Sequence, residues 1–326
     1  MAGAYAITTF MDPPQKNSEQ QGGKDIMQEQ SRAIRADSSR EGEDKFQGKP
    51  VVVAAGGAKL LAHDEKTGED LEVVPTGTST IPHFPKTMNL PIPGAVNEEE
   101  TEYTLVGLGV RTVSFLSIEV YVVGLYIQTS SLSALQAKFI KHINPLASSL
   151  IPGEKEKLRS TLLDPEESYR LWDEILKDTS GDVNSAFRIV PTKNTDFQHL
   201  RDGWVRGIKA RTQAAGSKGN LEFTDEGFGS SMGEFNALFG RKGKAPKGSV
   251  LVLTRDGSGR LGVIYQDKSG ATENFGTLED ERIARLIWLG YVGGKNVSSE
   301  DARKKIIDGV IHLVERPLGT AATQIT

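Results

Sequence analysis

One arginine stands out among the residues able to take part in binding or catalysis. Arg111 lies inside TLVGLGVRTVSFLSIEVYVVGLYI (104–127), a run that is otherwise rich in β-branched and aromatic residues. A guanidinium keeps its charge when buried, so it needs an anionic or carbonyl partner. Two partners fit this requirement. One is a bound carboxylate, phenolate or enolate held by the arginine fork, and the other is a structural pair with an acid such as Glu119.

Two tyrosines follow Arg111 closely in the same run. Tyr121 and Tyr126 each carry a phenol able to donate to an anion held by the arginine, although aromatic residues in strands also serve as simple core. The chain has no cysteine, which excludes disulfides, thiolate metal sites, iron–sulfur clusters and cysteine nucleophiles. It also has no GxxxxGK[ST] motif, so the common nucleotidase pattern is absent.

The histidines do not form a metal-binding pattern. The five of them, at positions 63, 83, 142, 199 and 312, show neither HxxxH nor HxH spacing, which argues against a zinc enzyme. A single histidine is enough for an axial haem ligand, and His199, on a predicted amphipathic helix among basic residues, is the candidate. A lone helix histidine also occurs as an ordinary surface residue, and both interpretations stay open.

Length and charge set the broad class of the protein. The chain has 326 residues with a formal net charge of −4, so no positive field draws it to nucleic acid. The run 104–127 is long enough to span a membrane, but Arg111 and Glu119 lie well inside it, and a pair of strands is favoured. The N-terminus shows neither a secretory signal nor a mitochondrial presequence. The sequence itself therefore does not support membrane association.

Composition divides the chain into four segments. Residues 1–49 mix charges of both signs with Gln, Ser and Gly and are expected to be disordered. Residues 50–95 contain a short strand pair followed by a proline-rich connector, and residues 319–326 form a flexible tail. The main domain is expected over residues 96–318.

The main domain is predicted to alternate blocks of strands and helices. We expect strands at 104–127 and 187–191 and a hairpin over 248–267 that turns at Asp256–Gly259. Helices are predicted at 131–143, at 164–178 with Asp164 as N-cap, at 194–214 capped by Asn194 or Thr195, and at 234–240. Two closing helices follow at 283–293 and 300–314, where Thr277 with Asp280 and Ser298 with Asp301 have capping-box spacing. Strands and helices in blocks indicate an α+β fold, an antiparallel sheet covered on one face by helices.

Several of these segments resemble the chalcone isomerase superfamily. The run 104–127 is similar to its glycine-rich strand entry, G-x-R and closing G-x-Y, here Gly109, Arg111, Gly124 and Tyr126. The likeness continues through PKGSVLVLTRDGSGRLGVIYQD and LIWLGYVGGKNVSSEDARKKIIDGV and covers roughly residues 100–315. NTDFQHLRDGWVRGIKAR and PTGTSTIPHFP look most like its fungal branch of altered-inheritance-of-mitochondria proteins.

The resemblance implies an open-faced sandwich with a ligand cleft between the sheet and the helices. In plant chalcone isomerases the arginine matched by Arg111 stabilises the phenolate or enolate during cyclisation. The family's threonine on the next strand falls at Tyr121, and its hydroxyl-bearing helix positions fall near Arg282 and Ile283. Its catalytic tyrosine and asparagine have no clear match, which argues against efficient chalcone cyclisation.

Two functional hypotheses follow from this comparison. The first is a binder of a small apolar ligand with an acidic group, such as a fatty acid or haem, held by Arg111. This function requires no cofactor, and haem is the candidate if a cofactor is bound. The alternative is an isomerase (intramolecular lyase) in which Arg111 stabilises an oxyanion and Tyr121 assists. The resemblance also implies mitochondrial localisation. The candidate ligand-binding residues are Arg111, Tyr121, Tyr126, His199, Trp204, Arg282 and Ile283.

Overall fold

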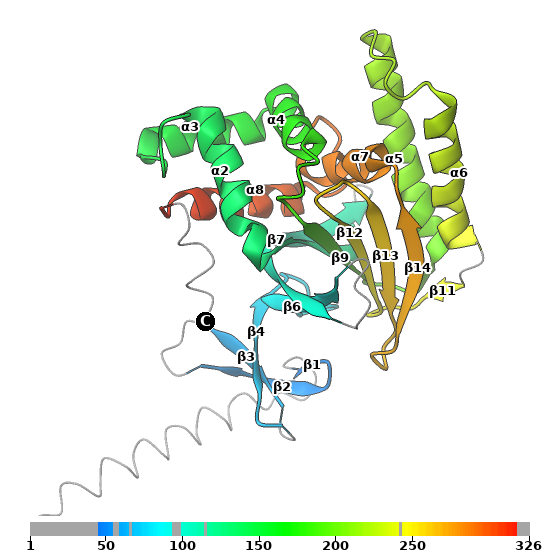
Figure 1. Ribbon diagram of the computed structural model, residues 1–326. Helices are drawn as coiled ribbons and strands as arrows, with labels where there is room; N and C mark the ends of the chain where they lie inside the picture. The colour runs from blue at the N-terminus through cyan, green and yellow to red at the C-terminus, as the bar shows by residue number, and fades with distance from the viewer. Residues whose placement is uncertain are drawn as a thin grey trace, which may run out of the picture.

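A seven-stranded antiparallel sheet organises the main domain (Figure 1). The computed structural model describes residues 45–54, 59–64, 67–92, 99–113, 116–240 and 243–317. Residues 1–44, which make up most of the segment expected to be disordered, lie outside these ranges, and so does the predicted tail, 319–326. The strands, in the spatial order β14-β13-β12-β9-β8-β7-β6, are β6 (Thr87–Pro91), β7 (Glu100–Val113), β8 (Ile118–Gln128), β9 (Ser185–Pro191), β12 (Val250–Arg255), β13 (Leu261–Gln266) and β14 (Thr272–Leu278).

The central strands of this sheet are buried on both faces. Along β8, Tyr121, Val123 and Leu125 pack into the core beneath the helices, whereas Val122 and Tyr126 pack into a second core on the opposite face. Successive residues of a strand point to opposite faces, so a strand covered on both sides needs apolar residues at nearly every position. This explains why the run 104–127 has the hydropathy of a membrane span and yet forms the predicted strand pair β7 and β8.

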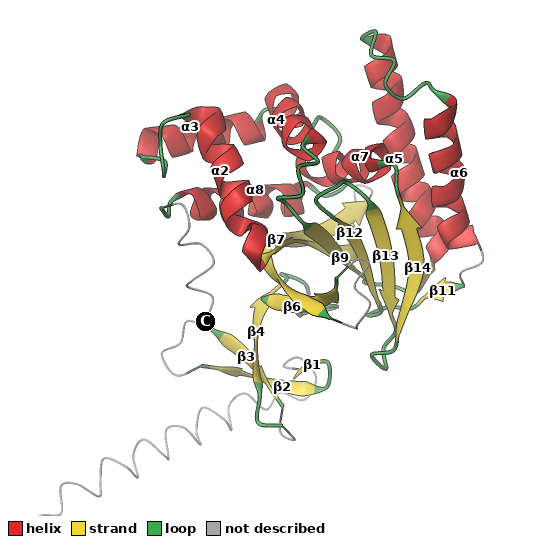
Figure 2. Cartoon of the chain, viewed as in Figure 1, coloured by secondary structure: helices red, strands yellow, loops and turns green. Residues whose placement is uncertain are grey.

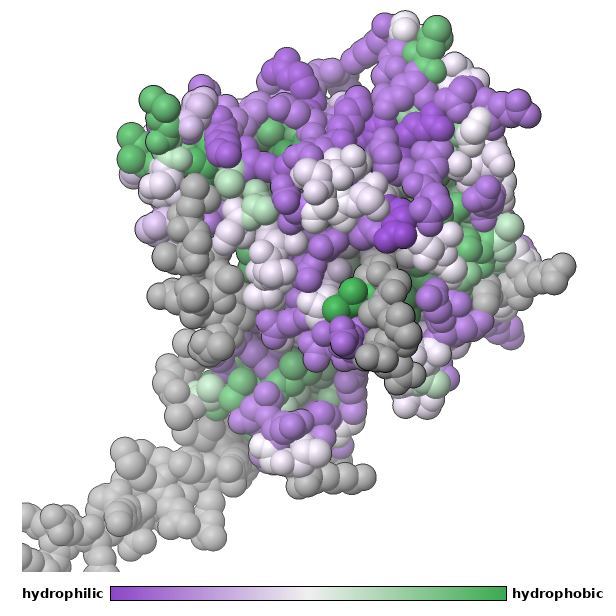
Figure 3. Space-filling model, viewed as in Figure 1, coloured by the Kyte–Doolittle hydropathy of each residue, from purple (hydrophilic) through white to green (hydrophobic). Residues whose placement is uncertain are grey.

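The helices gather on one face of the sheet (Figure 2). On the side drawn in Figure 3 they present mainly hydrophilic side chains to solvent. Within the described ranges no helix is long and apolar enough to cross a membrane. The elements are the 3-10 turn η1 (Thr129–Ser131) and the helices α2 (Leu132–Ile143), α3 (Pro152–Leu163), α4 (Pro165–Lys177), α5 (Phe197–Ser217), α6 (Glu226–Gly240), α7 (Glu281–Val292) and α8 (Glu300–Val314). The α+β class with helices on one face is confirmed.

Helix α8 lies unusually close to strand β7. A Cβ added at Gly109 would lie 2.3 Å from the backbone nitrogen of Ala302, and one at Gly107 would lie 2.5 Å from the carbonyl oxygen of Lys305. The start of α8 is tied to the strand, since Ser299 Oγ donates to the Val110 carbonyl at 2.8 Å. The two strand glycines therefore make room for a helix backbone, and this contact fixes the part of β7 that leads to Arg111.

A smaller antiparallel sheet precedes the main one and lies below it in Figure 1. It has the order β1-β2-β3-β4-β5, formed by β1 (Lys45–Phe46), β2 (Lys49–Val53), β3 (Leu60–His63), β4 (Asp70–Pro75) and β5 (His83–Pro85). A third, two-stranded sheet pairs β10 (Thr195–Asp196) with β11 (Lys244–Ala245). The proline-rich connector thus contains β5 and β6, and because β6 pairs with β7, the main sheet begins at Thr87 instead of near residue 96.

Helix starts differ from the capping prediction at three positions. Helix α5 is capped by Asp196, α7 by Asp280 and α8 by Ser299, each accepting a hydrogen bond from a backbone N–H of the first turn. Thr195 belongs to β10 and Thr277 to β14, so neither is available as a cap. Asp164 caps α4 as predicted.

Candidate ligand site around Arg111

Arg111 lies near the end of β7, directly opposite Tyr121 on β8. Its guanidinium is half-buried, and its Nη1 donates a long hydrogen bond of 3.5 Å to Tyr121 Oη. The guanidinium carbon is 5.6 Å from the centre of the Tyr121 ring, within the range of a cation–π contact. Burial opposes the charge, but the neighbouring Tyr121 and Tyr291 outweigh it and raise the pKa of Arg111. The group is a permanent cation at a partly dry position.

Two further side chains continue this contact into the core. Tyr121 Oη and Tyr291 Oη are 2.8 Å apart, and Trp204 Nε1 donates to Tyr291 Oη at 2.9 Å. Tyr291, from α7, is completely buried, and this burial raises the pKa of its phenol well above the ordinary value, so it stays neutral. The strands β7 and β8 and the helices α5 and α7 thereby contribute one residue each to a polar chain, which we call the arginine network: Arg111, Tyr121, Tyr291 and Trp204.

Aromatic rings surround the inner end of the arginine network. Phe187 packs against Tyr291 with ring centres 4.6 Å apart and against Trp288 at 4.9 Å. Trp288 satisfies its own N–H by donating to Ser185 Oγ at 3.0 Å. The inner polar atoms are therefore either hydrogen-bonded or enclosed by apolar rings, and the charged end of the network is Arg111.

The structural pair with Glu119 does not form. Glu119 instead accepts a hydrogen bond from Thr78 Oγ1 at 2.7 Å. Among the residues that the structure describes, no carboxylate lies within ion-pairing distance of Arg111, whose polar contact is the Tyr121 hydroxyl. Of the two partners expected for Arg111, the described structure therefore does not supply the acid of the chain itself.

The other predicted site residues are not brought to this network. Tyr126 points to the opposite face of β8, where its hydroxyl donates to the Pro85 carbonyl at 2.6 Å. Arg282, at the start of α7, is held by ion pairs with Asp225 and Asp280, and Ile283 is fully buried in the core.

His199 does not fit the haem site expected of it. It lies in the first turn of α5 with its side chain exposed, whereas Leu200 and Trp204 of the same helix face the core. An axial ligand must face an apolar pocket large enough for the porphyrin, and an exposed side chain has no such surroundings. The described residues also contain no group of three or more acids or histidines suited to holding a metal ion.

Tyr291 is the network residue that the sequence did not reveal. It lies in the segment IARLIWLGYVG, where the residues next to it are apolar and typical of a core. The available signal was indirect, because a buried tyrosine or tryptophan needs a partner for its polar atom. Trp204, Tyr291 and Tyr121 supply one another with such partners.

Comparison with known proteins now identifies the family. A model of chalcone isomerase-like proteins matches residues 101–307. The chain belongs to the chalcone isomerase-like family. This confirms the predicted superfamily and agrees with the sheet and one-sided helix layer. The match begins within β7 and ends within α8, so it contains all four residues of the arginine network.

This chain is similar in sequence to fungal relatives, and it aligns with one plant structure. The chain is 35% identical over 214 residues to "altered inheritance of mitochondria protein 18, mitochondrial" of Debaryomyces hansenii, covering 65% of this chain and 68% of the relative. Its likeness to the protein of the same name from Kluyveromyces lactis is 27% over 277 residues and covers 82% of each. A crystal structure of an Arabidopsis thaliana fatty-acid binding protein aligns with a TM-score of 0.47 and 18% identity, over 78% of this chain and 98% of that one. The fungal names confirm the mitochondrial localisation expected from the resemblance.

Proposed function

We propose that this chalcone isomerase-like protein binds an apolar ligand with an acidic group, and that Arg111 and the Tyr121 hydroxyl hold the acid. The carrying observation is the half-buried guanidinium that lacks a carboxylate partner within the described chain. A cation in this position gains most from an anion supplied by a ligand, because a charge-assisted hydrogen bond is stronger at a partly desolvated site.

The hydrogen-bond order in the arginine network supports the same role. Trp204 Nε1 can only donate, so Tyr291 Oη accepts from it. Tyr291 is completely buried, and its own proton is satisfied when it donates to Tyr121 Oη at 2.8 Å. The Tyr121 proton is then free to point towards an anion held by Arg111. The network would thereby present two donors to one acid, a guanidinium and a phenol.

The isomerase alternative has less support from these residues. An oxyanion also suits Arg111 and Tyr121, but cyclisation needs further groups that orient the substrate and water. Trp204 donates its N–H to Tyr291 and therefore has no proton to donate to a substrate. Binding is therefore the function favoured by the arginine network.

A matched pair of probes tests the proposal. Dodecanoate and dodecanol share an alkyl chain and differ in the acid, so calorimetric titration separates the contribution of the charge. We expect the full-length protein to bind dodecanoate, and Arg111→Gln to weaken this affinity by about 10- to 100-fold, because a hydrogen bond between charged groups is worth about 1.5–3 kcal/mol. Dodecanol binding should not change.

Arg159→Gln is the control for a general effect of removing an arginine. Arg159 lies on α3 and is already paired with Asp308 at 2.6 Å, so its loss should leave dodecanoate affinity unchanged. Equal dodecanoate affinity in Arg111→Gln and the parent protein would refute the role of Arg111.

Two further measurements distinguish the other ligands and activities. Haemin titration followed by the Soret band tests the haem hypothesis, and a band that survives in Arg111→Gln but disappears in His199→Ala would assign the ligand to His199 instead. Turnover of a chalcone, followed by its absorbance and abolished in Arg111→Gln, would establish the isomerase alternative.

A further inference from the structure

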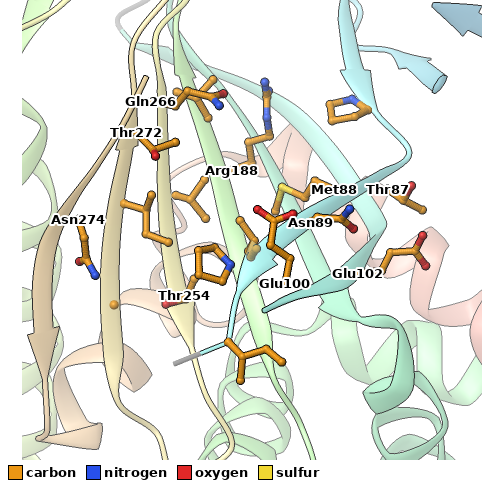
Figure 4. A pocket seen from close by; sticks show the side chains of 18 of the residues that line it. Thr87, Met88, Asn89, Glu100, Glu102, Arg188, Thr254, Gln266, Thr272 and Asn274 are labelled. Atoms are coloured by element: carbon orange, nitrogen blue, oxygen red, sulfur yellow. The ribbon is translucent and has the colours of Figure 1, made fainter. Parts of the chain in front are cut away.

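The sheet face opposite the helices carries a large cavity of about 910 Å³ (Figure 4). It is bounded by the seven-stranded sheet and by Phe46 and Leu71 of the smaller sheet. Small-molecule sites in proteins typically have volumes of about 300–1,000 Å³, so this space is large enough for a metabolite. It is separate from the arginine network, because Arg111 and Tyr121 lie on the helix-covered side.

A buried arginine projects from the middle of the sheet into this cavity. Arg188, on β9, is 6% exposed and lines the cavity, where Figure 4 shows it among the surrounding side chains. Its neighbours Phe187 and Ile189 belong to the core beneath the helices, so alternation along the strand directs Arg188 to the opposite face. The sequence FRIVP therefore places a cation on the side of the sheet that the helices leave open.

The charge of Arg188 is not compensated by the part of the chain that is described. Its Nη1 is buried without a hydrogen-bond partner, and no carboxylate among the described residues lies within ion-pairing distance of it. The contact it does make is with the face of Phe84, whose ring centre is 4.4 Å from the guanidinium carbon. Burial lowers the pKa of Arg188, but an arginine stays protonated even so.

A second arginine in the same cavity shows the contrast. Arg260 also lines it, but the Asp256 carboxylate accepts a hydrogen bond from its Nε at 2.7 Å. The acids Glu99, Glu100, Glu102 and Glu279 also contribute to the lining, and all four residues are exposed. The buried charge that lacks a counter-ion is therefore positive.

The rest of the lining combines apolar and uncharged polar side chains. Met88, Val250 and Ile264 supply apolar surface, and Thr254, Gln266 and Asn274 supply hydrogen-bonding groups. Such a mixture is typical of sites that hold a small organic molecule by its body and orient it through a few polar contacts.

We propose that this cavity is a second ligand site, specific for a small organic anion whose carboxylate or phosphate group is held by Arg188. The apolar and amide-bearing walls would contact the body of the molecule. This inference does not rest on the proposed function, since its residues and its face of the sheet are different.

Probes with one body and different head groups test the proposal on the full-length protein. Benzoate and phenyl phosphate carry the two anions on the same ring, and benzyl alcohol is the neutral reference. We expect one of the anions to bind at least tenfold more tightly than benzyl alcohol, and the better one identifies the head group. Arg188→Met should reduce this affinity at least tenfold, the loss expected for a hydrogen bond between charged groups.

Two control variants separate this site from general charge effects and from Arg111. Arg260→Gln removes a cavity charge that is already paired, so it should change the affinity by less than about threefold. Arg111→Gln should leave benzoate and phenyl phosphate binding unchanged. Loss of dodecanoate binding in Arg111→Gln, with benzoate binding retained, would keep the two sites distinct.

A measurement on the unaltered protein guards against misfolding of Arg188→Met. Methyl resonances of Val250 and Ile264, which line the cavity, should shift on adding the tighter-binding anion, whereas those of Leu132 and Leu135 in the opposite core should not. The proposal is overturned if neither anion binds more tightly than benzyl alcohol, if folded Arg188→Met binds as tightly as the parent, or if the shifts lie only in the opposite core.

Discussion

A single methyl group placed on helix α8 should test the contact that fixes strand β7. A Cβ added at Gly309 would lie 1.9 Å from the Val106 carbonyl oxygen and 2.8 Å from its carbon. Ordinary contacts between non-bonded heavy atoms are about 3.5–4.0 Å, so the helix must move by well over 1 Å to accept Gly309→Ala. The obstacle is backbone, which has no alternative rotamer to adopt.

The energetic cost of Gly309→Ala follows from three contributions. Overpacking of this kind costs about 1–3 kcal/mol, and the rigid obstacle favours the upper part of that range. Displacement of α8 also stretches the hydrogen bonds that Val110 makes with Ser299 at 2.8 Å and with Asp301 at 2.9 Å, for about a further 1 kcal/mol. Alanine offsets about 1 kcal/mol of this cost, because its helix propensity is higher than that of glycine. The net loss of unfolding free energy is about 2–3 kcal/mol.

Gly233→Ala is the matched control, because Gly233 lies inside helix α6 and a Cβ there would meet nothing within 4 Å. The same substitution should therefore stabilise the protein by about 0.5–1 kcal/mol. Urea unfolding followed by tryptophan fluorescence measures both variants, and equal slopes would show that the compactness of the unfolded state is unchanged. A Gly309→Ala protein as stable as the parent would refute the close packing of α8 on β7.

Three further changes have expected outcomes of different sizes. Tyr291→Phe should lower the unfolding free energy by about 1–3 kcal/mol in urea, because the buried Trp204 N–H loses its acceptor; an unchanged midpoint would contradict the network. Arg285→Met should cost about 3–5 kcal/mol by the same assay, since the arginine is buried against three acids, and a neutral result would show that they are solvated. The hydrogen bond from Lys138 holds the pKa of Asp178 at about 2. At pH values above about 4, Asp178→Asn should therefore lower the melting temperature slightly, and this difference from the parent should vanish as the pH falls towards 2. A difference that persists at the lower pH would exclude this ion pair as its cause.

The sheet was predictable where the sequence alternates or runs apolar between turns. The hairpin over 248–267 and the strands in 104–127 appear as β12 with β13 and β7 with β8. Helix α3 was missed because Leu158 and Leu162 are its only buried residues, which leaves no apolar stripe. Strand β14 was missed because it is an edge strand with mainly polar residues.

The site was predictable only in its charged member and its immediate neighbour. Arg111 and Tyr121 attract attention because a charge inside an apolar strand demands a partner, and their pairing in register follows from the hairpin. Tyr291 is about 170 residues away along the chain from Tyr121, and no local pattern indicates which buried tyrosine a distant strand will meet. Such contacts depend on how α7 packs over the sheet, which spacing within one segment does not determine.

Hydrogen-bond accounting separates structural arginines from those suited to ligands in this fold. Arg285 is 1% exposed, but three carboxylates surround it, so its charge is already used to join α7 to its neighbours. Arg111 and Arg188 also lie in apolar strands, yet within the described chain their guanidinium groups meet a phenol and a phenyl ring instead of acids. In sequence all three look alike, as single cations in apolar segments. Because an unpaired buried charge is costly, a bound anion would stabilise the protein more at Arg111 and Arg188 than at Arg285.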